Sequence, residues 1–167
     1  MEVVAQERIV GVIKEKYEGE ILRAEMLYDF LTITLKKEKI VEVIRHLYNH
    51  PQTEFKFLTT LCGIHYPDIN QVAVMYQVHN MVSNERLRLK VYLPADKPTV
   101  DTLTDVFPAA NWMERETYDF FGVTFEGHPN LIRILNVEDM IMFPLRKEFP
   151  LEDQVRQDKN DTMFGRN

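Results

Sequence analysis

The sequence predicts an α+β fold, a two-layer domain with a mixed sheet of about five strands and helices packed on one face. Segments with helical or strand periodicity follow the order helix, two strands, helix, three strands, which departs from the strict βαβα alternation of a doubly wound sheet. After Gly122 the chain has no clean period and is rich in proline and charge, which predicts an extended C-terminal arm. We therefore divide the chain into an α+β domain, residues 1–121, and a partner-binding arm, residues 122–167.

Apolar residues at helical spacing predict a first helix over residues 4–17, and Gly19 stands where this helix would end. Two strands should follow over residues 20–36, because ILRAEM and DFLTITLK alternate or carry β-branched and aromatic residues. The segment KEKIVEVIRHLYNHP then places its apolar residues on one helical face. This second helix should end near Asn49, since the residue before Pro51 is pushed out of the helical conformation.

The middle of the chain predicts three consecutive strands. FKFLTTLCGI reads as a strand ended by Gly63, and residues 72–79 alternate with period two. In RLRLKVYLP the apolar residues alternate with Arg86, Arg88 and Lys90, so that strand has one buried and one solvent-facing side. We expect the last two strands to form a hairpin through the turn SNE.

A third helix is predicted over residues 99–121. Asn111 and Glu114 have the spacing of an N-cap residue and the third helical residue in a capping box. Arg115 and Asp119 are four residues apart and are predicted to pair on the helix surface.

The stretch ERETYDFFGVTFEGHP also allows a catalytic interpretation. Glu114, Glu116 and His128 could supply the acid and base of a freestanding hydrolase. Carboxylates two residues apart on a helix point about 200° apart around its axis, so they would cooperate poorly. The sequence favours a structural role for this charge cluster, and we expect no catalytic residue in the chain.

The predicted arm mixes apolar and basic residues without the period of a helix or strand. We expect such a segment to be covered by another protein. Gly122 suits the left-handed position after the helix, and His128 and Pro129 follow in a tight turn. Arg146 and Lys147 are predicted to face a partner. Without a partner, the apolar residues near them would form an exposed strip: Phe143, Pro144, Leu145, Phe149 and Leu151.

The sequence contains no complete motif for binding a metal ion or a cofactor. His46 and His50 could share a helical face, but no HExxH motif is present. Cys62 and His65 form an isolated CxxH, which favours a small buried thiol over a zinc ligand or a nucleophile. The six glycines are not spaced as in a dinucleotide-binding or phosphate-binding loop. We expect no metal and no cofactor in this chain.

Charge and hydropathy limit the range of partners. The net charge of −6 provides no basic field for phosphates, so nucleic acid is not an expected partner. A single cysteine forms no internal disulfide and no thiolate cluster. No apolar run approaches the roughly 18 residues that cross a bilayer, so membrane contact should be indirect, through a partner.

Three linked motifs, ERETYDFFG, GHPNLIRIL and PLRKEFPLE, resemble the signature of the 30 kDa subunit of respiratory complex I, the family that includes the C-type subunit of bacterial NADH-quinone oxidoreductase. The resemblance is dense from Trp112 to Glu152. Two departures stand out. Ile132 occupies the position of the first of two basic residues, which leaves Arg133 alone, and MIMFPLRK lacks a glycine-containing turn that often precedes PLRK.

The resemblance implies a non-redox component in the peripheral arm of a proton-translocating NADH:quinone oxidoreductase, on the cytoplasmic side of the cell inner membrane. It implies a hetero-oligomer in which the chain packs on the 49 kDa subunit and near an iron–sulfur subunit of complex I, scaffolding the quinone-reducing module. FMN and iron–sulfur clusters would belong to partner subunits. An equivalent component of a related membrane-bound hydrogenase or of an F420- or ferredoxin-linked dehydrogenase is the alternative. The residues expected to carry structural or interface roles are Glu114, Arg115, Glu116, Tyr118, Asp119, Gly122, His128, Pro129, Arg133, Pro144, Arg146 and Lys147.

Overall fold

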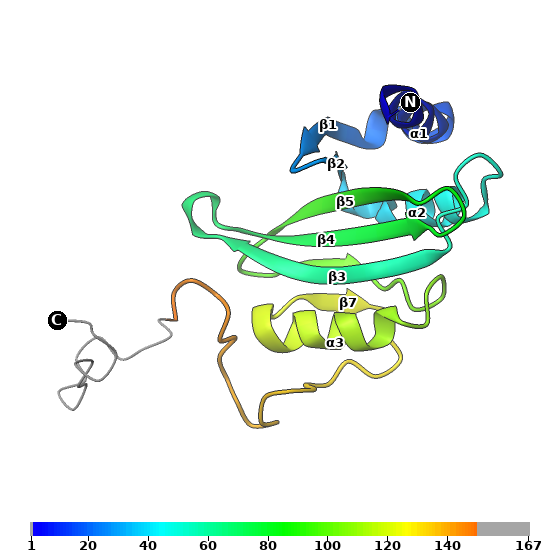
Figure 1. Cartoon of the computed structure of the whole chain (residues 1–167). Coiled ribbons are helices and arrows are strands. Elements are labelled where there is room, and N and C mark those ends of the chain that lie inside the picture. Colours follow the sequence, from blue (N-terminus) through cyan, green and yellow to red (C-terminus); the bar gives the residue numbers. More distant parts are fainter. Residues whose placement is uncertain (1, 150–167) are drawn as a thin grey trace, which may run out of the picture.

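A computed structural model describes residues 2–149 and confirms the α+β fold with a mixed five-stranded sheet. The strand order is β1-β2-β5-β4-β3, in which β2 and β5 are parallel and the other neighbours are antiparallel (Figure 1). The main elements are α1 (Glu2–Tyr17), β1 (Ile21–Leu27), β2 (Phe30–Leu35), α2 (Ile40–Asn49), β3 (Phe57–Tyr66), β4 (Gln71–Asn80), β5 (Glu85–Pro94), β6 (Thr99–Asp101), α3 (Ala110–Phe121) and β7 (Thr124–Glu126). Short 3-10 helices cover Glu18–Glu20, Lys37–Lys39 and Pro67–Ile69.

The predicted hairpin of the last two strands forms between β4 and β5, and β1 and β2 form a second hairpin. Tyr28 and Asp29 both have positive φ in the tight turn between β1 and β2. In the turn between β4 and β5, the side-chain oxygen of Asn80 accepts hydrogen bonds from the amides of Val82 and Ser83. Both turns lie at the same end of the sheet, because β2 and β5 run parallel.

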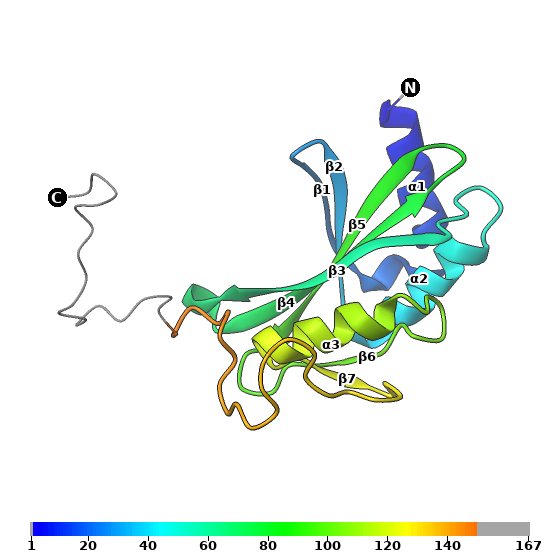
Figure 2. The same ribbon diagram turned by 60° about the horizontal axis from the view of Figure 1, so that its bottom comes forward.

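One face of the sheet carries the core. Alternate residues of β5 are buried on this face, as the period-two pattern predicts, and α2 packs its apolar side onto it. β4, which lies between β5 and β3, is buried at most of its positions on both faces. The fully buried residues of β5 and α2 are Leu87, Leu89, Val91, Leu93, Ile40, Val43, Ile44 and Leu47. Figure 2 shows α1, α2 and α3 along one side of the twisted sheet, which leaves its other face open.

The predicted helix over 99–121 is correct only in its second half. Residues 99–101 instead form β6, which pairs in parallel with β7 in a two-stranded sheet. The helix begins at Ala110, so Asn111 lies inside its first turn and the expected capping box is wrong. Val123 and Phe125 are buried beside β6, so the packed core extends past the predicted boundary at residue 121.

Two glycines allow close packing at the end of α3. A Cβ atom on Gly63, in β3, would lie 2.5 Å from a ring carbon of Phe121, so α3 rests directly on this strand. Gly122 has a φ of +74°, as predicted for the position after the helix, and the ring of Phe143 occupies the space of its missing side chain. The arm therefore begins in contact with the helix it follows.

Replacing Gly63 with alanine should lower the free energy of unfolding by about 1–3 kcal/mol, because the new methyl group displaces the Phe121 ring. Urea unfolding of the two proteins measures the difference. Gly11→Ala in α1 is the matched control, because no atom lies within 4 Å of its added methyl group, and it should be neutral or stabilising by up to about 1 kcal/mol. Equal stability of the Gly63→Ala variant and the parent would contradict this packing.

Candidate functional site

Five of the predicted site residues, Tyr118, Asp119, Gly122, Arg133 and Arg146, meet where α3 joins the arm. The last four carbonyl groups of an α-helix have no partner inside the helix. In α3 each of them accepts a hydrogen bond from the chain that follows. The donor and acceptor pairs are the Gly122 amide and Tyr118 (2.8 Å), Arg133 Nη1 and Asp119 (2.8 Å), the Leu145 amide and Phe120 (3.2 Å), and Arg146 Nε and Phe121 (2.8 Å). The arm thus completes the C-terminus of α3, and its two arginines oppose the negative end of the helix dipole.

The buried carboxylate of Asp119 organises the next part of the arm. Its Oδ2 atom accepts the backbone amides of Ile134, Leu135 and Asn136 at 2.8–3.1 Å. Its Oδ1 atom pairs with Arg133 at 2.7 Å and also accepts the Asn136 side-chain amide. Burial alone would raise the pKa of Asp119, but the hydrogen bonds from Asn136, Arg133 and Leu135 outweigh it and hold this pKa well below its usual range.

Arg133 and Arg146 direct their guanidinium groups into the chain and not toward a partner as predicted. Each guanidinium carbon lies 5.2 Å from the centre of the Phe143 ring, which is therefore held between two cations. The ring also meets Tyr118 edge-on at 6.2 Å. Arg133 donates a further hydrogen bond to the Met140 carbonyl. These contacts bend the arm back over α3 and explain why both arginines are nearly buried.

Glu114 makes a separate attachment, away from the arm. Its fully buried carboxylate accepts the Leu103 amide at 2.6 Å and the Thr102 hydroxyl at 2.5 Å, which joins the end of β6 to α3. Burial raises the pKa of Glu114 to about 7, although the two hydrogen bonds oppose the shift. The Tyr76 hydroxyl is also buried and has no hydrogen-bond partner within the described chain. Its pKa is raised by burial and by the nearby Glu114 charge.

Arg115 and Glu116 do not pair with Asp119, although the spacing of Arg115 and Asp119 predicts an ion pair. Arg115 donates to the carbonyls of Ile132 and Arg133, at 3.1 Å each, and forms no ion pair with Asp119. Glu116 is exposed on the opposite side of the helix from the buried Glu114. Glu114, Arg115 and Asp119 therefore bond to different segments of the chain, and Glu116 faces solvent.

His128 fixes the turn that begins the arm, as predicted. The Asn130 amide donates to its Nδ1 atom at 3.0 Å, so its Nε2 atom carries the proton and donates to the Asn111 carbonyl at 3.1 Å. Pro129 beside it is exposed. Both ring nitrogens of His128 form hydrogen bonds, and Glu114 and Glu116 lie on opposite sides of α3. His128, Glu114 and Glu116 therefore do not form the acid and base arrangement that a hydrolase requires.

The isolated histidines and the cysteine also have local explanations. Cys62 and His65 are three residues apart on β3 and so lie on opposite faces of the sheet. His65 accepts the Lys147 amide at 2.9 Å, which ties the arm back to β3, a contact that the sequence does not indicate. His46 bonds the Val12 carbonyl. Within residues 2–149 no three ligand-type side chains are grouped to hold a metal ion.

The outer surface of the arm combines large apolar side chains with exposed charged ones at Glu138, Asp139, Lys147 and Glu148, whereas Arg133 and Arg146 point inward. We define the arm surface by its large exposed residues: Ile132, Leu135, Val137, Ile141, Met142 and Leu145. Ile141 is 92% exposed, and Ile132 and Ile141 line a hollow of about 400 Å³ beside Tyr118. The predicted apolar strip is thus shifted. Phe143, Pro144 and Phe149 are half-buried, and Leu151 lies outside the described residues, as does the rest of the predicted arm over 150–167.

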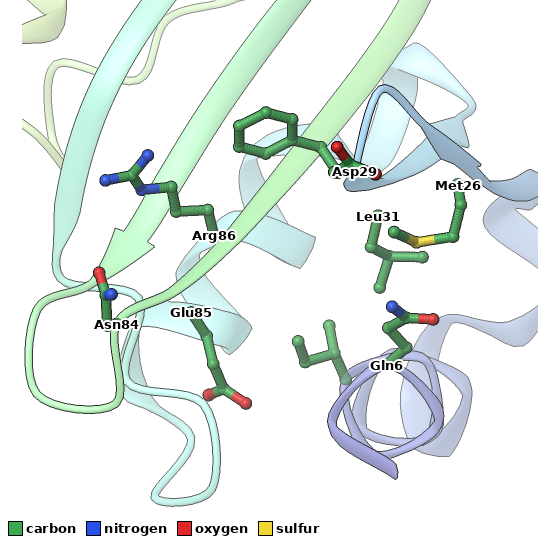
Figure 3. Close-up of a pocket in the computed structure, with 9 residues that line it drawn as sticks. Gln6, Met26, Asp29, Leu31, Asn84, Glu85 and Arg86 are labelled. Atoms are coloured by element: carbon green, nitrogen blue, oxygen red, sulfur yellow. The ribbon is translucent and has the colours of Figure 1, made fainter. Parts of the chain in front are cut away.

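A second cavity, of about 340 Å³, contains none of the predicted site residues. It lies between α1, the β1–β2 hairpin and the start of β5. Figure 3 shows Gln6 of α1 beside Met26 and Leu31, with Glu85 and Arg86 on another wall. Glu85 is already paired with Arg8.

Among residues 2–149, no helix is both long and apolar enough to cross a bilayer.

Comparison with known sequences gives one consistent family. Residues 33–155 match the family described as respiratory-chain NADH dehydrogenase, 30 Kd subunit. The second C-type subunit of NADH-quinone oxidoreductase from Rhizobium meliloti is 44% identical over 136 residues, covering 81% of this chain and 74% of the relative. The C-type subunit of Citrifermentans bemidjiense is 34% identical, covering 90% and 92%. The chain spans only 62% of the corresponding protein of Mycolicibacterium gilvum, to which it is 37% identical over 82% of its own length.

Two solved structures share the fold. The trypsin-resistant fragment of Nqo5, residues 1–134 of that protein, superimposes with a TM-score of 0.62 at 29% identity and covers 78% of this chain and 100% of the fragment. A chain of the membrane-bound sulfane sulfur reductase, an archaeal respiratory membrane complex, superimposes with a TM-score of 0.72 at 25% identity, covering 87% and 85%.

Replacing Asp119 with asparagine should lower the free energy of unfolding by on the order of 3 kcal/mol, because it leaves the nearly buried Arg133 without its counter-ion. Chemical denaturation at neutral pH measures the loss. Glu116→Gln removes an exposed carboxylate from the same helix and should change stability by no more than about 0.5 kcal/mol. Similar small effects of both substitutions would argue against the role assigned to Asp119.

Glu114 should make stability fall as pH rises. Its folded pKa, about 7, lies above its ordinary value of 4.5, so the folded state is favoured while the carboxyl is protonated. This contribution is fully present below pH 4.5 and is lost progressively up to about pH 7, amounting to about 3 kcal/mol. Unfolding measured between pH 5 and 8 should show this slope in the parent and in Glu126→Gln, and a much smaller slope in Glu114→Gln. A slope that survives in Glu114→Gln would assign it to another group.

Proposed function

Because this chain belongs to the family of the 30 kDa subunit of respiratory-chain NADH dehydrogenase, we propose that it is a non-redox component in the peripheral arm of a proton-translocating NADH:quinone oxidoreductase. Its relatives are named as subunits of NADH-quinone oxidoreductase, an enzyme complex. In this proposal the chain scaffolds the quinone-reducing module while electrons pass from NADH to quinone through other subunits. FMN and the iron–sulfur clusters are assigned to those partners and not to this chain.

The observation that carries the scaffold proposal is the polarity of the arm. Arg133 and Arg146 are occupied by contacts with α3, whereas six apolar side chains of the arm are exposed as the arm surface. A contiguous exposed apolar surface on a folded segment is typical of a protein–protein interface. The rigid attachment through Asp119 supports the same role, because a preorganised segment loses less entropy on binding than a free one.

We assign the arm surface chiefly to the 49 kDa subunit, with an iron–sulfur subunit nearby. This places the chain at the periphery of the inner membrane, on the cytoplasmic side, with membrane contact only through partners. Support comes from the family and from the position of the arm surface in the most motif-rich part of the sequence.

A related respiratory complex is the second candidate. The likeness to a chain of the membrane-bound sulfane sulfur reductase extends over most of both chains. A hydrogenase or an F420- or ferredoxin-linked dehydrogenase could use an equivalent component. Neighbouring genes for a flavin-binding, NADH-oxidising protein would favour the NADH dehydrogenase, whereas hydrogenase maturation genes would favour a hydrogenase.

Affinity purification of the tagged full chain from solubilised membranes tests the proposal. We expect the 49 kDa and iron–sulfur subunits of the NADH dehydrogenase to co-elute, and their absence would contradict it. Ile141→Asp should lower their recovery at least about tenfold, because it places a charge in the apolar interface. The isolated variant should keep the parental unfolding free energy, since residue 141 is 92% exposed. Val82→Asp, at a 95% exposed position in the β4–β5 turn, is the matched control and should leave recovery unchanged.

A further inference from the structure

The open face of the sheet carries a row of cations on β5. Arg86, Arg88 and Lys90 occupy alternate positions and therefore point to the side that no helix covers. Neighbouring members of this row are about 7 Å apart along the strand. Among the side chains of residues 6–149, no carboxylate lies within 4 Å of any of them, although the whole chain has a net charge of −6.

Aromatic and amide side chains hold two of these cations in place. The Arg88 guanidinium lies 3.9 Å from the centre of the Phe30 ring, and its Nε donates to Gln77 at 3.0 Å. Its terminal nitrogens have no hydrogen-bond partner within the described chain. A guanidinium stacked on a ring with its outer edge open has the geometry that binds a carboxylate with two parallel hydrogen bonds.

Lys90 is held between two tyrosines. Its Nζ atom lies 4.6 Å and 4.9 Å from the ring centres of Tyr66 and Tyr92 and donates to the Tyr66 hydroxyl at 2.6 Å. Burial would lower the pKa of Lys90, but its hydrogen bonds to the two tyrosines outweigh this and raise the pKa, so the cation persists at physiological pH.

Three like charges at this spacing repel one another, because about 7 Å is within the Debye length at physiological salt. The chain does not relieve this repulsion internally. Glu25 on β1, which points to the same face, is already paired with Arg23 at 2.7 Å. A ligand with carboxylates at matching spacing would relieve it, and alternate residues of an extended acidic segment repeat at about the same 7 Å.

We propose that the open sheet face, defined by Arg86, Arg88, Lys90, Phe30, Tyr66 and Tyr92, binds an extended acidic segment of a neighbouring protein in the complex. The inference rests on the proposed function, since it needs a hetero-oligomer. Charge complementarity selects an acidic protein segment. The match between the roughly 7 Å spacing of the row and the repeat of an extended strand favours a protein segment over an anionic lipid surface.

Carbodiimide cross-linking of the purified complex, followed by peptide mass spectrometry, tests this directly, since the reagent joins an amine to a carboxylate in contact. We expect Lys90 to be linked to an aspartate or glutamate of a partner. Lys39–Glu42 and Lys56–Glu54, at 2.6 Å and 2.5 Å, supply internal positive controls for the reaction. Internal links without any Lys90 link would overturn the proposal.

Charge reversal provides a second measurement. Arg88→Glu should lower the recovery of partner subunits at about 0.15 M salt by at least about tenfold, and Arg88→Gln should lower it less. Arg45→Glu, on the exposed side of α2, is the control and should have no effect. Failure of the parent chain to recover any partner would refute the proposed function, whereas full recovery with Arg88→Glu would refute only the docking face. Binding of the isolated parent, but not of Arg88→Glu, to phosphatidylserine vesicles would reassign the face to anionic lipid.

Discussion

The ion pair between Asp119 and Arg133 is the interaction on which the rest of the arm depends. A carboxylate with no exposed surface is stable as an anion only when its oxygens are fully hydrogen-bonded. Here both oxygens are satisfied by residues 133–136, so the Asp119 side chain fixes this segment, together with the hydrogen bonds of Arg115 to the carbonyls of Ile132 and Arg133. Arg133 then reaches the carbonyls of Met140 and Met142, which extends the constraint toward Phe143.

The hydrogen bonds between the arm and α3 also determine which side chains of the arm remain exposed. A short segment without strands or helices cannot bury both its backbone polar groups and its apolar side chains against a single helix. The hydrogen bonds to α3 satisfy the first requirement, and the apolar side chains stay in solvent. Polar contacts therefore fix the arm, while several of its apolar side chains remain uncovered. An interface with another protein would bury these side chains.

The sequence predicts the sheet and the first two helices well, because their signals are local. Period-two burial in β5 and the apolar face of α2 follow directly from residue spacing. β6 and β7 escape prediction, since three residues are too few to show a period. Within the site, spacing suggests that Asp119 pairs with Arg115, but Arg133, fourteen residues further on, is its actual partner. The contact between His65 and Lys147 joins residues 82 positions apart and leaves no local pattern.

The two proposed binding surfaces differ in chemistry and lie on opposite sides of the sheet. α3 packs on the core face through Gly63, and the arm surface lies beyond it, whereas the row of cations occupies the open face. Buried apolar area contributes most of the affinity in an interface, while complementary charge contributes orientation and association rate. A chain that presents one surface of each kind can join two neighbours at a fixed angle without any catalytic group of its own. The rigid sheet between the two surfaces sets that angle. In the proposed scaffold role, the chain would hold its two neighbours at this angle.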